Sequence, residues 1–387
     1  MVTYQYAPAA EGGAERQAQR LAEELVARGH RVGVVTPRPP GLRPRAIEAG
    51  VEVHRVWAVP KPRLSVTFLP NLARFLVTQG RTFQIWHAHQ AYYHASLALS
   101  LGALLGKPCI VKAAASGPYG DIARLQKAWM GQWMIGRLRR ADALVSLNAD
   151  LTSELVAAGV PHDRIRAIPN GVDCARFVPP SLEQRQAARS AFNIPPDTYV
   201  VLFAGRLVEE KGVTFLIDAW RVLEAQSPNL RYHLLVAGNG RRGAEYRERA
   251  TTELRQATFL GRVPDVRTLL HAADVLVHPS LTEGISNIVL EAMATGLPVV
   301  GTRIGGLVEQ IVHGVTGILV APKDAQALAA AIDALVAEPG RRSAMGRAAR
   351  DAVQRRYSLE AMVDAYESLY AGLVSSDDRR SGANRQS

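Results

Sequence analysis

Cysteine is scarce in this 387-residue chain, which contains only Cys109 and Cys174. Both lie in apolar or inter-domain surroundings without a metal-type spacing, which argues against a disulfide framework and a zinc site. No apolar run reaches the roughly 18 to 20 residues that span a bilayer, and the N-terminus lacks the basic and apolar blocks of a signal peptide. We therefore expect a cytoplasmic protein that is neither exported nor membrane-spanning.

Three short motifs are also missing. The chain has no His-Glu-x-x-His and no Gly-x-x-x-x-Gly-Lys-Ser/Thr, which excludes zinc hydrolases of that type and P-loop enzymes. It also has no Asp-x-Asp pair that would bridge a divalent ion and a diphosphate. Positive side chains and a helix end would take the place of the metal. We accordingly expect no metal and no cofactor.

Positive charge is unevenly spread along the chain. The net charge is +11, of which residues 1 to 175 contribute +9 (21 Lys and Arg, 12 Asp and Glu) and the rest +2 (25 and 23). A basic first half could attract anionic lipid, nucleic acid or a phosphorylated acceptor, or it could be a plain solvated surface. Nucleic acid is disfavoured because no recognition motif accompanies the basic residues.

Strand-like and helical patterns alternate at short spacing in both halves, which is typical of doubly wound α/β domains. The chain is too long for one core, and the turn sequence Ile168–Asp173 separates the halves. We predict a helix over Ala14–Ala27 and another over Asn287–Ala294. The predicted strands are Val32–Thr36, Val51–Val56, Ile85–Ala88, Ile110–Lys112 and Ala143–Leu147, then Tyr199–Ala204, Tyr232–Ala237, Thr258–Leu260, Val275–His278, Val299–Gly301 and Ile318–Val320.

The two ends of the chain are less regular. The residues before Gly12 leave room for only a very short first strand, so the start looks clipped, and a true start upstream stays open. A last helix is predicted over Leu359–Leu373, crossing back to the first domain. Residues 375–387 are charged, rich in small residues and without periodicity, and we expect them to be disordered.

The segment from His278 to Val300 combines an apolar strand, a turn, a helix start and two acids, Glu283 and Glu291. Both acids can face the crevice at the carboxyl edge of a parallel sheet, with a helix N-terminus between them. Acids hold hydroxyl groups and a helix N-terminus holds an anion. A sugar nucleotide presents those groups in that order, so the segment indicates a sugar-nucleotide enzyme.

Five further motifs occur in a specific order: Gly12–Arg16, Arg28–Val32, Pro169–Asp173, Gly205–Gly212 and Gly305–Glu309. Over nearly its whole length the chain resembles the family 4 retaining glycosyltransferases, glycosyl transferases group 1. The resemblance implies the GT-B fold, with two Rossmann-like doubly wound parallel-sheet domains facing a central cleft. We expect an N-terminal acceptor-binding domain over residues 1–172, a nucleotide-sugar domain over 173–354 and a crossing helix over 355–374.

Cleavage of a sugar from a nucleoside diphosphate builds negative charge on the departing phosphate. Arg206 and Lys211 follow a predicted strand at the carboxyl edge, where they can bind diphosphate oxygens. The resemblance assigns them that catalytic role, with Glu283 contacting the donor sugar near the reacting carbon. The implied donor-binding residues are Gly12, Gly13, Gly205, Val263, Ser286, Asn287, Ile288 and Glu291.

Some of these assignments keep an alternative. The resemblance gives Glu291 the ribose hydroxyls, Val263 the backbone-lined base pocket, and the amides from Ser286 to Ile288 the phosphate. Capping of the helix by the Ser286 side chain alone is the simpler reading. UDP, GDP and ADP sugars all stay open as donors. Gly12 and Gly13 would let the loop approach the donor phosphates, and they also fit an ordinary turn before a helix.

The chain departs from the family at one position. Many members carry a histidine after the strand that matches Ile110–Lys112, whereas this chain has none between Ala113 and Asp121. Ser116 could occupy that space, and Asp121 could bind an acceptor hydroxyl or cap the next helix. We expect transfer with retention, in which the donor diphosphate itself takes the acceptor proton and no side chain acts as nucleophile.

Other functions remain as alternatives. Gly238–Gly243 matches the dinucleotide fingerprint, but the next strand ends without the acid that a nicotinamide ribose needs. Other GT-B enzymes, such as a sugar-nucleotide epimerase or a phosphorylase, would share these motifs. A non-catalytic sugar-nucleotide-binding paralogue would keep the ligand without turnover.

The stretch Ile122–Arg140 places Ile122, Leu125, Trp129, Trp133 and Leu138 on one helical face with basic residues off it. It predicts either an ordinary helix packed on the first sheet or a peripheral helix on the inner face of the cell membrane. In the second case the acceptor would be lipid-linked, as in the synthesis of cell-surface polysaccharide or glycolipid.

Overall fold

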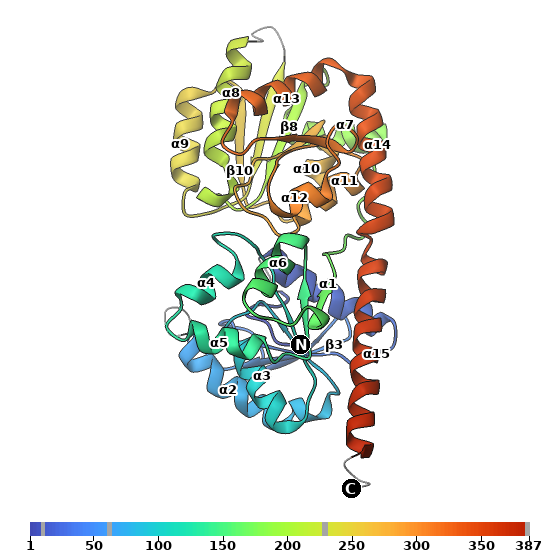
Figure 1. Cartoon of the computed structure of the whole chain (residues 1–387). Coiled ribbons are helices and arrows are strands. Elements are labelled where there is room, and N and C mark those ends of the chain that lie inside the picture. Colours follow the sequence, from blue (N-terminus) through green and yellow to red (C-terminus); the bar gives the residue numbers. More distant parts are fainter. Residues whose placement is uncertain (9–11, 60–63, 227–230, 384–387) are drawn as a thin grey trace. The chain divides into compact units, whose positions relative to one another are not determined.

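The computed structural model describes residues 1–8, 12–59, 64–226 and 231–383. The chain forms two compact units (Figure 1). The first comprises Met1–Asn170 and the segment from Glu360 onward, and the second comprises Gly171–Leu359. Each unit contains a largely or wholly parallel sheet with helices packed on it, as the alternating sequence pattern predicts.

The first unit's sheet has two hydrogen-bonded parts, ordered β2-β3-β1 and β4-β5-β6-β7. Val2 forms parallel bridges to Val35 and Ala88 and so joins the two parts. The short first strand expected before Gly12 is therefore a single bridging residue. The strands are β1 (Gly33–Pro37), β2 (Arg45–Glu48), β3 (Val51–Val56), β4 (Trp86–His89), β5 (Cys109–Lys112), β6 (Ala143–Ser146) and β7 (Ile165–Ala167).

The helices of the first unit before residue 170 are α1 (Gly13–Ala27), α2 (Leu64–Thr78), α3 (Tyr93–Leu105), α4 (Asp121–Lys127), α5 (Gly131–Leu138) and α6 (Ala149–Ala157). The predicted single amphipathic stretch over Ile122–Arg140 is wrong, because the chain turns between α4 and α5. Ile122, Leu125 and Leu138 are buried, whereas Trp129 and Trp133 are exposed.

Helix α15 (Leu359–Ala383) packs within the first unit. Arg28, the residue that follows α1, forms ion pairs with Asp364 (2.5 Å) and Glu367 (2.7 Å). Helix α15 extends as far as Ala383, and the expected disorder of residues 375–387 stays a prediction. Residues 384–387 of that expected tail lie outside the described residues.

The second unit is built on one six-stranded parallel sheet ordered β10-β9-β8-β11-β12-β13. Order reverses between β8 and β11, which is the switch point where such sheets bind ligands. The strands are β8 (Tyr199–Ala204), β9 (Tyr232–Ala237), β10 (Ala257–Gly261), β11 (Val275–His278), β12 (Val299–Thr302) and β13 (Gly317–Val320). All six agree with the predicted strands to within a residue or so.

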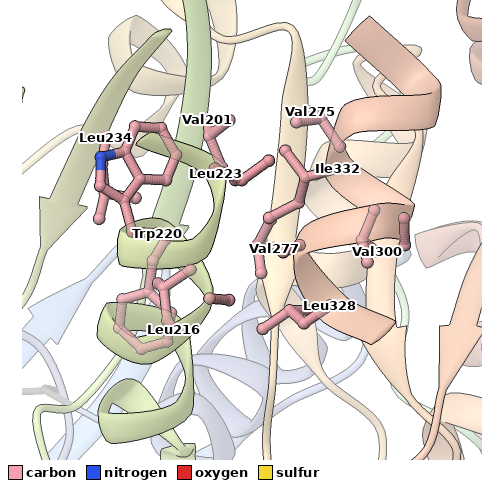
Figure 2. Close-up of a cluster of buried hydrophobic side chains, with 14 of the residues drawn as sticks. Val201, Leu216, Trp220, Leu223, Leu234, Val275, Val277, Val300, Leu328 and Ile332 are labelled. Carbon is pink, nitrogen blue, oxygen red and sulfur yellow. The ribbon is translucent and has the colours of Figure 1, made fainter. Parts of the chain in front are cut away.

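Helices cover both faces of this sheet: α7 (Leu182–Ala191), α8 (Val213–Gln226), α9 (Gly243–Glu253), α10 (Val266–Ala272), α11 (Asn287–Ala294), α12 (Gly305–Gln310), α13 (Ala325–Ala337) and α14 (Pro339–Arg356). Figure 2 shows Trp220 of α8 and Ile332 of α13 packed over Val201 and Val277 of neighbouring strands. All four side chains are fully buried or nearly so. This apolar core holds the strand ends, and therefore the loops that follow them, in fixed positions.

Among the described residues, no helix combines the length and the apolar character that crossing a membrane requires.

Candidate functional site at the carboxyl edge of the second sheet

The loops after β8, β11 and β12 pack directly on one another. Gly212 has φ of +67°, and a Cβ there would overlap the carbonyl oxygen of Pro279. Gly305, with φ of +41°, lies in the same way against the carbonyl of Glu283, and Gly306 donates its N–H to that oxygen (3.2 Å). Glycine permits both the backbone conformation and the close approach. Three strand ends thus converge around Glu283.

Lys211 and Glu283 meet at the centre of this cluster. Their ammonium and carboxylate form a short ion pair, and both side chains are largely buried. Burial by itself raises the pKa of Glu283, but the adjacent Lys211 and His278 outweigh it and hold the pKa well below its ordinary value. Glu283 is therefore an anion at neutral pH, and Lys211 is a cation held at the edge of the sheet.

His278, the last residue of β11, is a member of the cluster that the sequence reasoning missed. Its Nε2 lies 3.2 Å from Glu283 Oε2 and 3.2 Å from Ser286 Oγ. Ser280 Oγ donates a third hydrogen bond to the Glu283 carboxylate at 3.0 Å. The signal available in the sequence is a histidine ending an apolar strand five residues before the acid.

Ser286 precedes helix α11, but its side chain does not cap the helix. The hydroxyl lies beside His278, and the backbone N–H donates to Gln310 Oε1 (2.9 Å) while Gln310 Nε2 donates to Ser286 O (3.0 Å). The simpler reading of Ser286 as a cap is therefore wrong. The first turn of α11, with Asn287 and Ile288, begins directly beside the Lys211–Glu283 pair, and the amides of such a turn point out of the helix end.

Glu291 lies in α11 and is only 5% exposed. Its neighbours from Val289 to Ala294 are buried as well. Glu291 is therefore not an ordinary surface acid, and burying a carboxylate is costly unless polar groups satisfy it. The structure thus places one acid at each side of the α11 N-terminus, Glu283 before it and Glu291 in its second turn.

Arg206 follows Gly205 at the end of β8 and points into solvent with 66% of its side chain exposed. Its guanidinium lies 3.9 Å from Glu210, and Arg241 lies at the same distance from the other oxygen of that carboxylate. Glu210 also accepts the backbone N–H of Leu281 at its carbonyl (2.8 Å). Arg206 is consequently a loosely held cation near the more rigid Lys211.

The loop Gly238–Gly243 that matches the dinucleotide fingerprint has a packing role. Gly240 lies against the carbonyl of Leu207, Leu207 donates its N–H to Asn239 O (2.9 Å), and Gly238 donates to Gly261 O (2.7 Å). These glycines bring the loops after β8, β9 and β10 together. Val263, assigned to the base pocket, lies half-buried two residues beyond β10.

In the first unit, Gly12 is the extended residue that precedes α1, and Gly13 is the first residue of that helix. The carboxylate of Glu15 folds back toward Gly12 and accepts a hydrogen bond from Gln90 Nε2 (3.1 Å). Gln90 follows β4 with φ of +72°, which non-glycine residues rarely adopt. An anion at this helix end would have to displace the Glu15 carboxylate.

Ser116 and Asp121 are both buried in the loop after β5. Asp121 Oδ2 accepts the N–H of Ala114 (2.7 Å), and burial raises the pKa of this carboxyl to about 6. The alternative of Asp121 as a helix cap is wrong, because Gly120 occupies the cap position without a side-chain bond. Asp121 instead closes the loop on the end of β5.

His87, His89 and Lys112 form a buried group at the ends of β4 and β5, next to helix α15. His87 Nδ1 lies 2.8 Å from the hydroxyl of Tyr370, and the rings of His87 and His89 stack at 4.2 Å. Lys112 donates to Asn170 Oδ1 (2.9 Å), and burial lowers its pKa to about 7. Burial lowers the pKa of both histidines as well, so they are neutral.

Two Rossmann-like units in one chain define the GT-B class of glycosyltransferases. The chain is similar to the solved sucrose-phosphate synthase of Thermosynechococcus elongatus (24% identity, TM-score 0.81, covering 97% of this chain and 98% of that one). It is also similar to Anabaena Alr3699/HepE solved with UDP and glucose (20%, 0.80, 96% and 98%). These likenesses confirm the predicted fold.

Sequence comparison identifies the family. Residues 198–338 match "Glycosyl transferases group 1" and residues 12–171 match "Glycosyl transferase 4-like domain". D-inositol 3-phosphate glycosyltransferase of Pseudarthrobacter chlorophenolicus is 32% identical over 376 residues, covering 87% of this chain and 85% of the relative. The chain belongs to the glycosyl transferases group 1 family, and it is a glycosyltransferase.

Proposed function

We propose that the protein is a retaining glycosyltransferase that moves a sugar from a nucleoside-diphosphate sugar to an acceptor, without a metal. The observation that carries this proposal is the Lys211–Glu283 pair beside the first turn of α11. A cation and a helix N-terminus at one edge suit a diphosphate, and the two flanking acids suit sugar and ribose hydroxyls. The HepE structure, solved with UDP and glucose, is similar in fold and supports a donor of this type.

The chemistry divides between donor and protein as follows. The bond from the anomeric carbon to the diphosphate oxygen breaks, and a bond to the acceptor oxygen forms on the same face. The acceptor proton passes to the departing diphosphate oxygen. Lys211 and Arg206 stabilise the growing negative charge, while Glu283 orients the sugar and Glu291 the ribose.

The remaining assignments follow from the same donor pose. Gly205, Val263, Ser286, Asn287 and Ile288 would line the donor in the second unit, and the assignment of Gly12 and Gly13 to the donor stays a prediction. The acceptor is a glycan, a lipid-linked sugar or a small molecule, and Ser116 and Asp121 act through the loop that shapes its site. We place the reaction in the cytoplasm, at the inner face of the membrane when the acceptor is lipid-linked, in the synthesis of cell-surface polysaccharide or glycolipid.

A donor screen tests this function. Purified protein is heated with UDP-, GDP- and ADP-sugars in the presence and absence of EDTA, and the melting temperature and the release of nucleoside diphosphate are recorded. We expect one nucleotide class to stabilise the protein and to be slowly hydrolysed despite EDTA. If a nucleotide sugar stabilises the protein but no acceptor gives turnover, the result favours a binding-only paralogue. If no nucleotide sugar stabilises the protein, the result contradicts the donor site.

A further inference from the structure

The corner between α4 and α5 turns a hydrophobic side chain outward. A Cβ at Gly131 would overlap the carbonyl oxygen of Leu125, so only glycine lets α5 begin this close to the end of α4. Ala128 N–H donates to Leu125 O (3.0 Å) and Gly131 N–H donates to Ala128 O (2.9 Å), which closes two successive tight turns. Trp129 lies at the apex of this corner.

Trp129 is 92% exposed and Trp133, one turn into α5, is 41% exposed. The core of the unit does not need them, since Ile122, Leu125 and Leu138 of the same stretch are already buried. A nearly fully exposed indole keeps a large apolar area in water, at a cost of roughly 25 cal/mol per Å². Trp129 and the partly exposed Trp133, four residues apart in the chain, together present an apolar surface with no covering element among the described residues.

The charge around this surface has one sign. Residues 122–141 contain Arg124, Lys127, Arg137, Arg139 and Arg140 and no Asp or Glu. Lys127, Arg137 and Arg140 form no ion pair within the part of the chain that the structure describes. The guanidinium of Arg137 lies over the Trp133 ring (5.3 Å), and Arg164 adds a further cation against the Arg139 and Ala141 carbonyls.

We propose that this corner, the Trp129–Trp133 surface with its surrounding arginines and Lys127, docks on an anionic lipid bilayer. Indole rings settle at the membrane interface, where their apolar part is buried and the N–H stays hydrated, while Lys and Arg reach the headgroups. Each such cation near an anionic surface strengthens binding through electrostatic attraction. The exposed position of Trp129 at the apex of the corner suits a deformable bilayer better than a pocket in a protein partner.

The docking surface is separate from the Lys211–Glu283 cluster of the second unit, because all of its residues lie in the first unit. It rests on the proposed function only for the suggestion that a lipid-linked acceptor is met at this surface. Membrane docking and turnover are measured separately, so the failure of one does not conceal the failure of the other.

Vesicle flotation of the full chain tests the proposal. Protein is mixed at low salt with phosphatidylcholine vesicles or with vesicles that also contain phosphatidylglycerol. We expect binding to the anionic vesicles, a blue shift of tryptophan emission, and a roughly tenfold or greater loss of binding in Lys127→Gln/Arg140→Gln. Trp129→Gln/Trp133→Gln should lose the blue shift and most of the binding.

Matched variants of the same unit serve as controls. Trp57 is 55% exposed and Arg81 is exposed, and both lie outside the corner. Trp57→Gln and Arg81→Glu should bind vesicles like the unchanged chain, and all variants should keep its circular dichroism and melting temperature. Absence of binding to anionic vesicles, or equal binding by the Trp129→Gln/Trp133→Gln variant, would overturn the proposal.

Discussion

Lys211 and Glu283 are in direct ionic contact although 72 residues separate them along the chain. The contact joins the loop after β8 to the loop after β11, the two strands between which the sheet order reverses. In the proposed mechanism, the cation that this contact holds meets the departing diphosphate. Because Lys211 is both a structural partner and a proposed catalytic group, the two roles can be separated by experiment.

Lys211→Met should lower turnover by at least two orders of magnitude and destabilise the protein by about 3 kcal/mol, because it leaves the buried Glu283 carboxylate without its main partner. The double variant Lys211→Met/Glu283→Gln should regain most of that stability and none of the turnover. Chemical denaturation and initial rates measure the two effects. If the double variant recovered activity, Lys211 would have only a structural role.

Arg206→Ala should reduce turnover by about tenfold or more without changing the melting temperature, since its side chain is mostly in solvent. Arg241→Ala is the matched control, because Arg241 is 70% exposed and lies at the same 3.9 Å from Glu210. Steady-state kinetics on both variants give the comparison. Equal loss in the two would mean that the charge of the loop matters and not the position of Arg206.

Glu291→Gln should weaken donor binding by roughly 10- to 100-fold, the range expected for losing a charge-assisted hydrogen bond. The substitution keeps the volume of this buried side chain, so the fold should be retained. Titration calorimetry with the nucleoside diphosphate reports the affinity, and a deoxyribose analogue provides the control. The variant and the unchanged protein should bind that analogue with similar affinity if Glu291 holds a ribose hydroxyl.

The buried histidines predict a loss of stability in acid. Burial and the nearby Lys112 hold the pKa values of His87 and His89 below 6.5, so below about pH 6.5 the unfolded chain binds more protons than the folded one. Stability should fall as the pH is lowered from about 7 toward the folded-state pKa. Neither ring nitrogen of His89 has a hydrogen-bond partner among the described residues, so His89→Leu should be stabilising and should reduce the acid sensitivity. Denaturation curves across this pH range measure the effect. The assignment would be contradicted if the free energy of unfolding depended on pH as steeply in His89→Leu as in the unchanged chain.

The sequence predicted most of the second unit because its strands are apolar runs bounded by turns, and α11 agrees residue for residue. Strand β2 was missed because an edge strand with half-exposed side chains has little periodic signal, and β7 because it has only three residues. The α4–α5 corner depends on Gly131 meeting the Leu125 carbonyl, a packing contact that helical periodicity does not encode.

The site, too, contains residues that the sequence predicted and contacts that it did not. Glu283, Lys211 and Glu291 lie on motifs that fix their order, whereas the links through His278 and Ser286 depend on side-chain directions known only from the fold. The left-handed backbone of Gln90 and the Glu15 carboxylate beside Gly12 had no sequence signal either.

The most direct test of the account is titration of nucleoside diphosphates into the full chain and into Lys211→Met, each with and without EDTA. We predict saturable binding of one nucleotide by the unchanged chain, weakened at least tenfold in the variant. Absence of binding, equal affinity in the two proteins, or binding that EDTA abolishes would contradict a metal-free diphosphate site at Lys211.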